Sequence, residues 1–462
     1  MELPNLTLIF VGLYACAMIG VGVFAARNQN KDGYIIGNRN LNLFQMAAST
    51  GAEFRDAAFV AFWITFSYLY GYAILLVVIP SFIIQLSYIW IGPKVRKLAH
   101  ERNYIMPGRM IRDFVGPTSQ YTAVLFILFL TIAFGAAQLF VLGKIISSAT
   151  DFSEPFIIIT IATIIGFYLW TGGFGSVIKT DIIQFFIILG MVSLPFFLTI
   201  ETDALLDWKS LGNMPISDLF YLSFPIAVGA YANYGVWQRI FAARDDTAAA
   251  YAPSFSGIFF IINTLGLVFI GLAARTIFPA DIEPGDILTL LFQLETLSPF
   301  LLSFIILVMF AMGMSTYDTN AYAFSSSILR DFTFISARTE QDHYIKYNRI
   351  ATIAFILLTV TMAVSYESLV NLTLGLISVF NLPSIIYLCA ALGLLKKDKF
   401  LDVGLSASVW ISTATFIYLF AIGAFENSMA NTIIPTCVML ALSCGVILVS
   451  LLISRLSKKA VS

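Results

Sequence analysis

The amino-acid sequence predicts an all-α integral membrane protein that crosses the bilayer about thirteen times. Hydrophobic residues make up 59% of the 462 positions and charged residues only 11%, whereas soluble domains carry about 25% charged residues. A soluble fold of this length would lack the polar residues needed to cover its surface. Two further observations, long apolar runs and a biased distribution of Lys and Arg, support the same fold class.

A membrane-spanning helix needs about 20 predominantly apolar residues. By this criterion the spans lie near 5–26, 44–67, 72–92, 120–147, 155–171, 177–200, 218–240, 253–278, 299–328, 348–366, 369–394, 402–424 and 431–454. The first run has no basic leader and is long enough to span the bilayer. We therefore expect it to be a retained helix and not a cleaved signal peptide.

Most of the 26 basic residues fall in the loops after the odd-numbered runs, counted with the adjoining helix ends. Only four fall elsewhere: Lys144, Lys209 and Arg275 outside, and Arg55 within a run. Because cytoplasmic loops are enriched in Lys and Arg, this places the N-terminus outside and the C-terminus in the cytoplasm of a multi-pass cell-membrane protein. No loop is long enough for a soluble domain, so residues 1–462 are expected to form one membrane domain.

Composition excludes several functional classes. The net charge of −1 argues against a nucleic-acid partner. The four cysteines lie in apolar runs and are expected to be small core residues, while His100 and His343 fall in polar connecting stretches. The chain therefore offers no His/Cys metal cluster, no Ser/His/Asp triad and no P-loop, and we do not expect an enzyme.

The second run contains three charged residues, Glu53, Arg55 and Asp56, directly after Gly51. A charge at bilayer depth costs at least ~2.5 kcal/mol, so such residues normally face a cavity or a partner. A broken helix that lines a watery cavity would accommodate them and would present its freed carbonyls to ions or solutes. The alternative is an internal ion pair in which Arg55 is neutralised by its neighbours.

The ninth run places Ser315, Thr316, Asp318 and Thr319 on one helical face. Clustered oxygens of this kind suit a hard cation such as Na⁺. The alternative is that the hydroxyls bond back to the preceding turn, which leaves Asp318 unexplained. Asp181, at the start of the sixth run, is compatible either with a site or with an ordinary charge at a helix N-terminus.

The seventh run is the second candidate for a break. Gly229 and Gly235 bracket a polar, aromatic patch that contains Tyr231, Asn233 and Tyr234. Runs two and seven are five apart, and paired interruptions of this kind indicate inverted repeats around a shared central site. The alternative is that the glycines serve close helix packing.

At these residues the chain resembles the sodium/solute symporter family, whose members include sodium/glucose and sodium/proline cotransporters. The most specific stretches are GGFGSVIKTDIIQ (172–184), similar to the family's GG…V..TD..Q signature, and WQRIFAARD (237–245), similar to its QR segment. The other matching stretches are GYIIGNRNL (33–41), YLYG (68–71), GAAQLFVLGKIISS (135–148) and MSTYDTNAYAFSSSILRD (314–331).

The resemblance implies a LeuT-like core of five plus five inverted helices (44–200 and 218–394), an extra N-terminal helix (5–26) and two C-terminal helices (402–454). It implies cation-coupled symport by alternating access. It places a sodium site at the carbonyls of Ala52, Arg55 and Met312 and the hydroxyls of Ser315 and Thr316. The second sodium of some members would lie at Asp181, Ser315, Asp318 and Thr319.

The chain also departs from the family pattern. It has Glu53, Arg55 and Asp56 where small polar residues are usual, Asp318 where serine is usual, and Ala321 and Tyr322 where an LN pair is usual. Because Asp181 and Asp318 would titrate as a coupled pair, a proton is the alternative coupling ion to Na⁺.

The charged trio also suggests the substrate. Carboxylates beside a guanidinium suit an amino acid or another small zwitterion, and the expected contacts are Glu53, Arg55, Asp56, Gln138, Tyr231 and Asn233. If the trio neutralises itself, a neutral solute such as a sugar is the alternative. A solute receptor that does not transport is the competing class, and accumulation of solute in vesicles would distinguish the two.

Overall fold

The computed structural model describes residues 3–27, 30–53, 55–192, 208–278, 282, 287–292, 298–332, 341–365, 384–393, 398–422, 441–454 and 456. Within these residues every element is helical, apart from one isolated parallel bridge between Leu41 and Ala243. Eight helices of this described part are long and apolar enough to cross a membrane. The predicted all-α membrane fold is thus confirmed, whereas the total of about thirteen spans stays a prediction.

The main helices are α1 (Leu3–Arg27), α3 (Leu43–Glu53), α4 (Ala57–Tyr70), α5 (Val78–Arg102), α7 (Pro117–Ser148), α8 (Glu154–Leu189), α10 (Ile216–Ala232), α11 (Tyr234–Ala242), α12 (Asp246–Ile277), α14 (Pro299–Ser327), α15 (Gln341–Val364), α17 (Ser384–Leu392) and α18 (Lys399–Ala421). Shorter elements connect them: α2 (Lys31–Ile36), α6 (Pro107–Phe114), α13 (Ile287–Phe292), the 3₁₀ turns Gly37–Arg39, Gly71–Val77 and Trp208–Gly212, and a π-helical turn at Ile328–Phe332.

Both predicted breaks are present. The second run is divided into α3 and α4, and the seventh into α10 and α11, with Asn233 between the two halves. The runs 155–171 and 177–200 correspond to two helical stretches within α8 that meet at Gly173, whose φ of 53° lies in the left-handed region. The run 369–394 is described only over residues 384–393, so most of it lies outside the described residues, and the run 431–454 is described from residue 441 onward.

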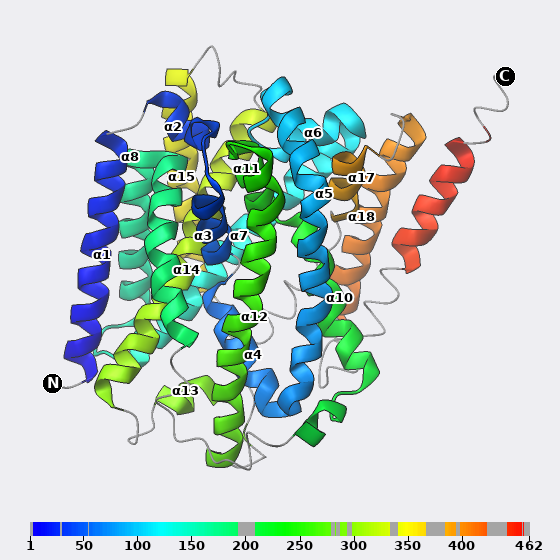
Figure 1. The fold of residues 1–462 in the computed structure, drawn as a ribbon. Coiled ribbons are helices and arrows are strands. Elements are labelled where there is room, and N and C mark those ends of the chain that lie inside the picture. The colour runs from blue at the N-terminus through cyan, green and yellow to red at the C-terminus, as the bar shows by residue number, and fades with distance from the viewer. Residues whose placement is uncertain are drawn as a thin grey trace.

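The helices form two packing groups (Figure 1). In the first group, α12 packs against α5, α3 and α4, and α10 packs against α5. In the second group, α14 packs against α7, α8 and α15, while α1 packs against α8 and α14. Helix α3 also contacts α8 and α14, so the first broken helix lies where the two groups meet.

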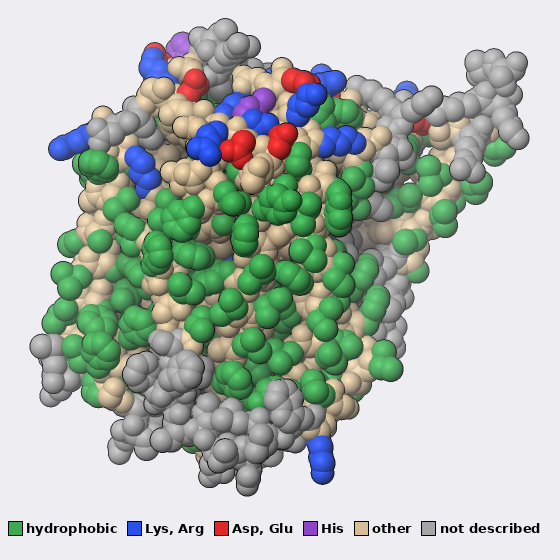
Figure 2. Space-filling view, in the orientation of Figure 1, with side chains coloured by type: hydrophobic (Ala, Val, Ile, Leu, Met, Phe, Trp, Pro, Cys, Tyr) green, Lys and Arg blue, Asp and Glu red, His purple; other side chains and the backbone are tan. Residues whose placement is uncertain are grey.

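The surface agrees with a membrane environment. Figure 2 shows a broad belt of hydrophobic side chains, with Lys and Arg gathered at the end of the molecule that carries α2, α6 and α11. Large apolar side chains such as Leu13, Trp90 and Phe129 are more than half exposed. Such exposure is costly in water and favourable in lipid.

Candidate functional site

The first break is stabilised by side chains that cap the new helix end. Asp56 is the N-cap of α4, where its Oδ1 accepts a hydrogen bond from the backbone N of Phe59 at 2.5 Å. Gln138 of α7 reaches the same end, because its Oε1 accepts from the backbone N of Ala57 at 2.8 Å. Two of the backbone groups that the break leaves without helical partners are thereby satisfied.

Arg55 is held by helix α12 and by the end of α3. Its Nη2 donates to the carbonyl of Ser256 in α12 at 2.6 Å, and its Nη1 donates to the carbonyl of Gly51. The guanidinium lies 4.3 Å from the ring centre of Phe259, a cation–π distance. The ion pairs found among the described residues do not include Arg55. The alternative of an ion pair within the trio therefore stays a prediction that these contacts do not show.

The two breaks are joined by a direct hydrogen bond. Asn233 caps α11 by accepting from the backbone N of Val236 at 3.1 Å, and its Nδ2 donates to Oε1 of Glu53 at 2.9 Å. Tyr231 turns instead toward α5, where its hydroxyl bonds that of Ser87 at 2.6 Å. Of the six expected substrate contacts, Glu53 and Asn233 thus meet directly, Asp56 and Gln138 share the N-terminus of α4, and Arg55 and Tyr231 face other helices.

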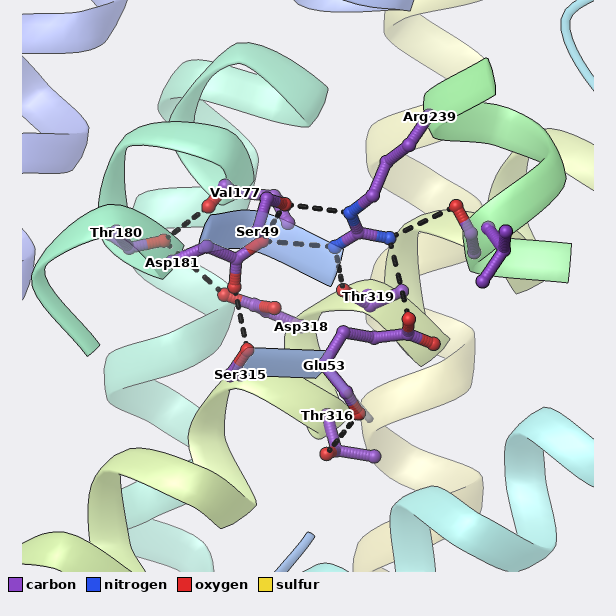
Figure 3. Close-up of polar contacts among 12 residues, drawn as sticks. Ser49, Glu53, Val177, Thr180, Asp181, Arg239, Ser315, Thr316, Asp318 and Thr319 are labelled. Atoms are coloured by element: carbon purple, nitrogen blue, oxygen red, sulfur yellow. Dashed lines mark hydrogen bonds and ion pairs between the residues drawn. The ribbon is translucent and has the colours of Figure 1, made fainter. Parts of the chain in front are cut away.

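Arg239 lies at the centre of the polar cluster, fully buried (Figure 3). Its Nη2 donates to Oδ2 of Asp181 at 2.9 Å and to the hydroxyl of Thr319 at 3.0 Å, and its Nε donates to Ser49 at 2.6 Å. Its Nη1 lies 3.8 Å from Oε2 of Glu53, an ion-pair distance. One guanidinium therefore contacts side chains from α3, α8 and α14.

The oxygen-rich face of α14 contacts the same cluster. Ser315 donates to Oδ1 of Asp181 at 2.6 Å, and Thr316 donates to the backbone carbonyl of Glu53 at 3.2 Å. These two hydroxyls bond to other helices, so the alternative of back-bonding to the preceding turn does not hold for them. Thr316 brings α14 against the first break, beside the carbonyl of Ala52, which accepts from the backbone N of Arg55 at 3.2 Å.

Asp318 of α14 also accepts hydrogen bonds from side chains of α8. Its Oδ2 accepts from the hydroxyl of Tyr168 at 2.7 Å and from that of Thr180 at 3.5 Å. Its Oδ1 is buried and has no hydrogen-bond partner among the described residues. Met312 is buried one turn before Thr316 on α14, which is compatible with its expected carbonyl role.

Sequence reasoning missed Arg239, Ser49 and Tyr168. The sequence places Arg239 near the end of a helix, as the structure does, but it does not show that the side chain is fully buried in the central cluster. The WQR segment was the available signal, although the sequence alone does not show where the guanidinium points. The described residues contain no group of three or more His, Cys, Asp or Glu arranged to hold a metal ion.

Comparison with known proteins shows which transporters the chain is similar to. Residues 34–210 match the family model of the sodium:solute symporter family. The sodium/pantothenate symporter of Haemophilus influenzae is 24% identical over 354 residues, which cover 71% of this chain and 72% of that protein.

Two solved transporters share the fold. The substrate-bound, outward-open state of a Na⁺-coupled sialic acid symporter superposes with a TM-score of 0.82 at 15% identity, over 98% of this chain and 97% of that one. A nucleobase-cation-symport-1 family transporter in a closed conformation gives a TM-score of 0.56 at 14% identity, over 92% and 95% of the two chains. The family match over residues 34–210 and the sequence relative confirm the resemblance to the sodium:solute symporter family that the sequence motifs indicated.

Proposed function

We propose that this protein is a secondary symporter that couples the inward movement of Na⁺ to the import of a small polar solute by alternating access. The observation that carries the proposal is the contact between the first break and α14, where Thr316 bonds the carbonyl of Glu53. A break frees backbone carbonyls at membrane depth, and α14 supplies hydroxyls at the same place. Oxygens of both kinds are the ligands that a hard cation prefers.

The donor set for the cargo ion comprises the carbonyls of Ala52, Arg55 and Met312 and the hydroxyls of Ser315 and Thr316. Ser315 is oriented by Asp181, and Thr316 by the first break. Because the carbonyls of Ala52 and Arg55 lie at the first break, whereas the carbonyl of Met312 and the two hydroxyls lie on α14 of the second packing group, an ion bound to both sets would hold the two groups together. Release of the ion would allow them to move apart, as alternating access requires.

We propose that the solute binds between the two breaks, with an amino group at Glu53 and Asn233. Glu53 accepts from Asn233 through Oε1, while Oε2 makes no hydrogen bond among the described residues and has only the 3.8 Å contact with Arg239. A donor from the solute would complete the coordination of this carboxylate. The carboxylate of a zwitterion would then face the N-terminal end of α11, because Arg55 is engaged by α12.

A thermal-shift screen of purified full-length protein tests the proposal. Small amino compounds, sugars and organic acids are each added with and without Na⁺ at two pH values. We expect amino compounds to stabilise the protein only when Na⁺ is present, and a radiolabelled hit to accumulate in vesicles under an inward Na⁺ gradient. Accumulation driven by a proton gradient alone would contradict Na⁺ coupling, and Na⁺-dependent binding without accumulation would indicate a receptor.

A further inference from the structure

Residues 31–42, which we call the strap, comprise α2 and the turn that leads from it into α3 (Figure 1). The first half of the strap is bound to the second packing group. The hydroxyl of Tyr322 in α14 donates to the backbone carbonyl of Ile35 at 2.7 Å. The hydroxyl of Tyr34 donates to Oδ1 of Asn348 in α15 at 3.3 Å. Helix α2 is therefore anchored on α14 and α15.

The second half of the strap is bound to the first packing group. The backbone N of Leu41 donates to the carbonyl of Ala242 at 3.0 Å, and its carbonyl accepts from the backbone N of Arg244 at 2.9 Å. Arg39 donates through Nη2 to the carbonyl of Tyr104, just beyond the end of α5, at 2.7 Å. Helix α11, which ends at Ala242, packs against α5 and α12. The strap thus joins the two groups at the basic end of the molecule.

Between these two anchors the backbone passes through three successive residues in the left-handed region. The φ angles are 60° at Gly37, 57° at Asn38 and 52° at Arg39. Glycine adopts such angles readily, whereas other residues are strained by them and normally adopt them singly. Strain of this kind persists only where the surrounding structure holds the backbone in place. The hydrogen bonds on either side of the turn supply that restraint.

We propose that the left-handed turn Gly37–Arg39 is a hinge between the two packing groups, and that Tyr322 is the positioning residue that ties the strap to α14. The proposal rests on the alternating access of the proposed function and adds to it the segment that bends. When the groups rock, the two anchors move relative to each other, and the change in backbone angles falls on the turn between them. Tyr322 belongs to the positions where the chain departs from the family pattern.

Distances between two spin labels in the purified full-length protein test the hinge. The labels replace Lys97 of α5 and Lys346 of α15, which are exposed and lie in different packing groups, and alanine replaces the four native cysteines. Under the proposed function this labelled parent protein shows two distance populations whose ratio changes with Na⁺. A single population that Na⁺ leaves unchanged would refute the proposed function, and the hinge with it.

Substitutions at Asn38 and Asn40 form a matched pair. Both side chains are exposed, but the φ of Asn40 is −127°, outside the left-handed region. We expect Asn38→Gly to shift the ratio about threefold to tenfold toward the population whose distance matches the structure, and Asn38→Ala to shift it similarly away. Both populations are folded, so effects on the unfolded chain cancel. The hinge is overturned if Na⁺ changes the ratio in the parent but the Asn38 variants behave like Asn40→Gly and Asn40→Ala.

Tyr322→Phe and Tyr317→Phe each remove one buried hydroxyl from α14. The hydroxyl of Tyr317 bonds that of Thr359 in α15 at 2.7 Å, a contact within the second group. We expect only Tyr322→Phe to broaden the distance distribution and to raise amide hydrogen exchange in α2 at least about tenfold, because only this variant frees the strap from α14. Equal distances and equal exchange in the two variants would overturn the role of Tyr322.

Discussion

The pair formed by Asp181 and Arg239 permits a quantitative prediction. Both side chains are fully buried and their charged atoms are 2.9 Å apart. Asp181→Asn keeps the shape and one oxygen acceptor but removes the charge, leaving Arg239 with only the more distant carboxylate of Glu53. Breaking a buried pair by removing one partner costs about 3–5 kcal/mol. We therefore expect a clear fall in the apparent melting temperature.

Sodium binding should weaken in the same variant. The unpaired guanidinium would repel a cation bound nearby, by about 2–4 kcal/mol at 4–8 Å and an effective dielectric constant of 20. Ser315, a proposed sodium ligand, would also lose the charged acceptor that orients it at 2.6 Å. A weakening of ²²Na⁺ binding by at least about tenfold follows, since 1.4 kcal/mol corresponds to a factor of ten.

The control is Asp342→Asn, which breaks the pair between Lys31 and Asp342. Its two atoms are also close, at 2.7 Å, but the side chains are 50% and 80% exposed. Exposed pairs contribute about 0–1 kcal/mol, so this variant should unfold and bind ²²Na⁺ like the wild type. The reasoning is refuted if Asp181→Asn matches Asp342→Asn in both melting temperature and ²²Na⁺ affinity.

Three further predictions concern the solute, a helix cap and a backbone turn. Glu53→Gln should abolish stabilisation by amino compounds in the thermal-shift screen while ²²Na⁺ still binds; equal stabilisation of both proteins would contradict a role for the carboxylate. Asp402→Asn should lower stability by about 1 kcal/mol, because Asp402 of α18 caps α7 by accepting from the backbone N of Ser119 at 2.7 Å; an unchanged melting temperature would show that the cap contributes little. Gly173→Ala should destabilise the protein because of the φ of 53°, whereas Gly12→Ala meets open space and should be neutral; similar melting curves for both would argue against this turn geometry.

The fold was largely predictable because membrane helices have a strong local signature. Apolar runs of sufficient length predicted the main spans, and charged residues inside a run predicted the break that begins after Glu53. Helix ends were less predictable: α5 continues to Arg102 and α12 begins at Asp246, both well beyond their apolar runs. Polar residues extend these helices past the hydrocarbon region, where hydropathy no longer marks the helix.

The candidate site was only partly predictable. Charged residues inside a predicted span can be read from the sequence, but the side chains with which they pair depend on how the helices pack. The sequence indicated that Glu53, Asp181 and Asp318 need partners, but the choice of partner depends on tertiary packing. Arg55, two residues from Glu53, donates to α12, whereas Arg239, far along the chain, reaches Asp181. Sequence proximity suggested Arg55 as the partner of Glu53, whereas the ion pairs of the structure involve Arg239. Spacing along the chain does not fix where a long flexible side chain ends.

The position of Arg239 between the two packing groups links the site to the transport cycle that we propose. Arg239 and Glu53 belong to broken helices that pack with the first group, whereas Asp181 and Thr316 belong to α8 and α14 of the second. The Arg239–Asp181 ion pair and the hydrogen bond from Thr316 to Glu53 therefore both cross the boundary between the groups.

In the proposed cycle the two packing groups rock against each other, and each contact that crosses their boundary must then either stretch or persist. An ion pair tolerates small displacements better than a hydrogen bond does, because Coulomb energy falls slowly with distance whereas hydrogen bonding is steeply directional. We therefore infer that Arg239 acts as a pivot that keeps its contact with Asp181 throughout the cycle. The contacts at Thr316, which include the proposed sodium ligands, are then the ones that form and break as the cavity opens to either side.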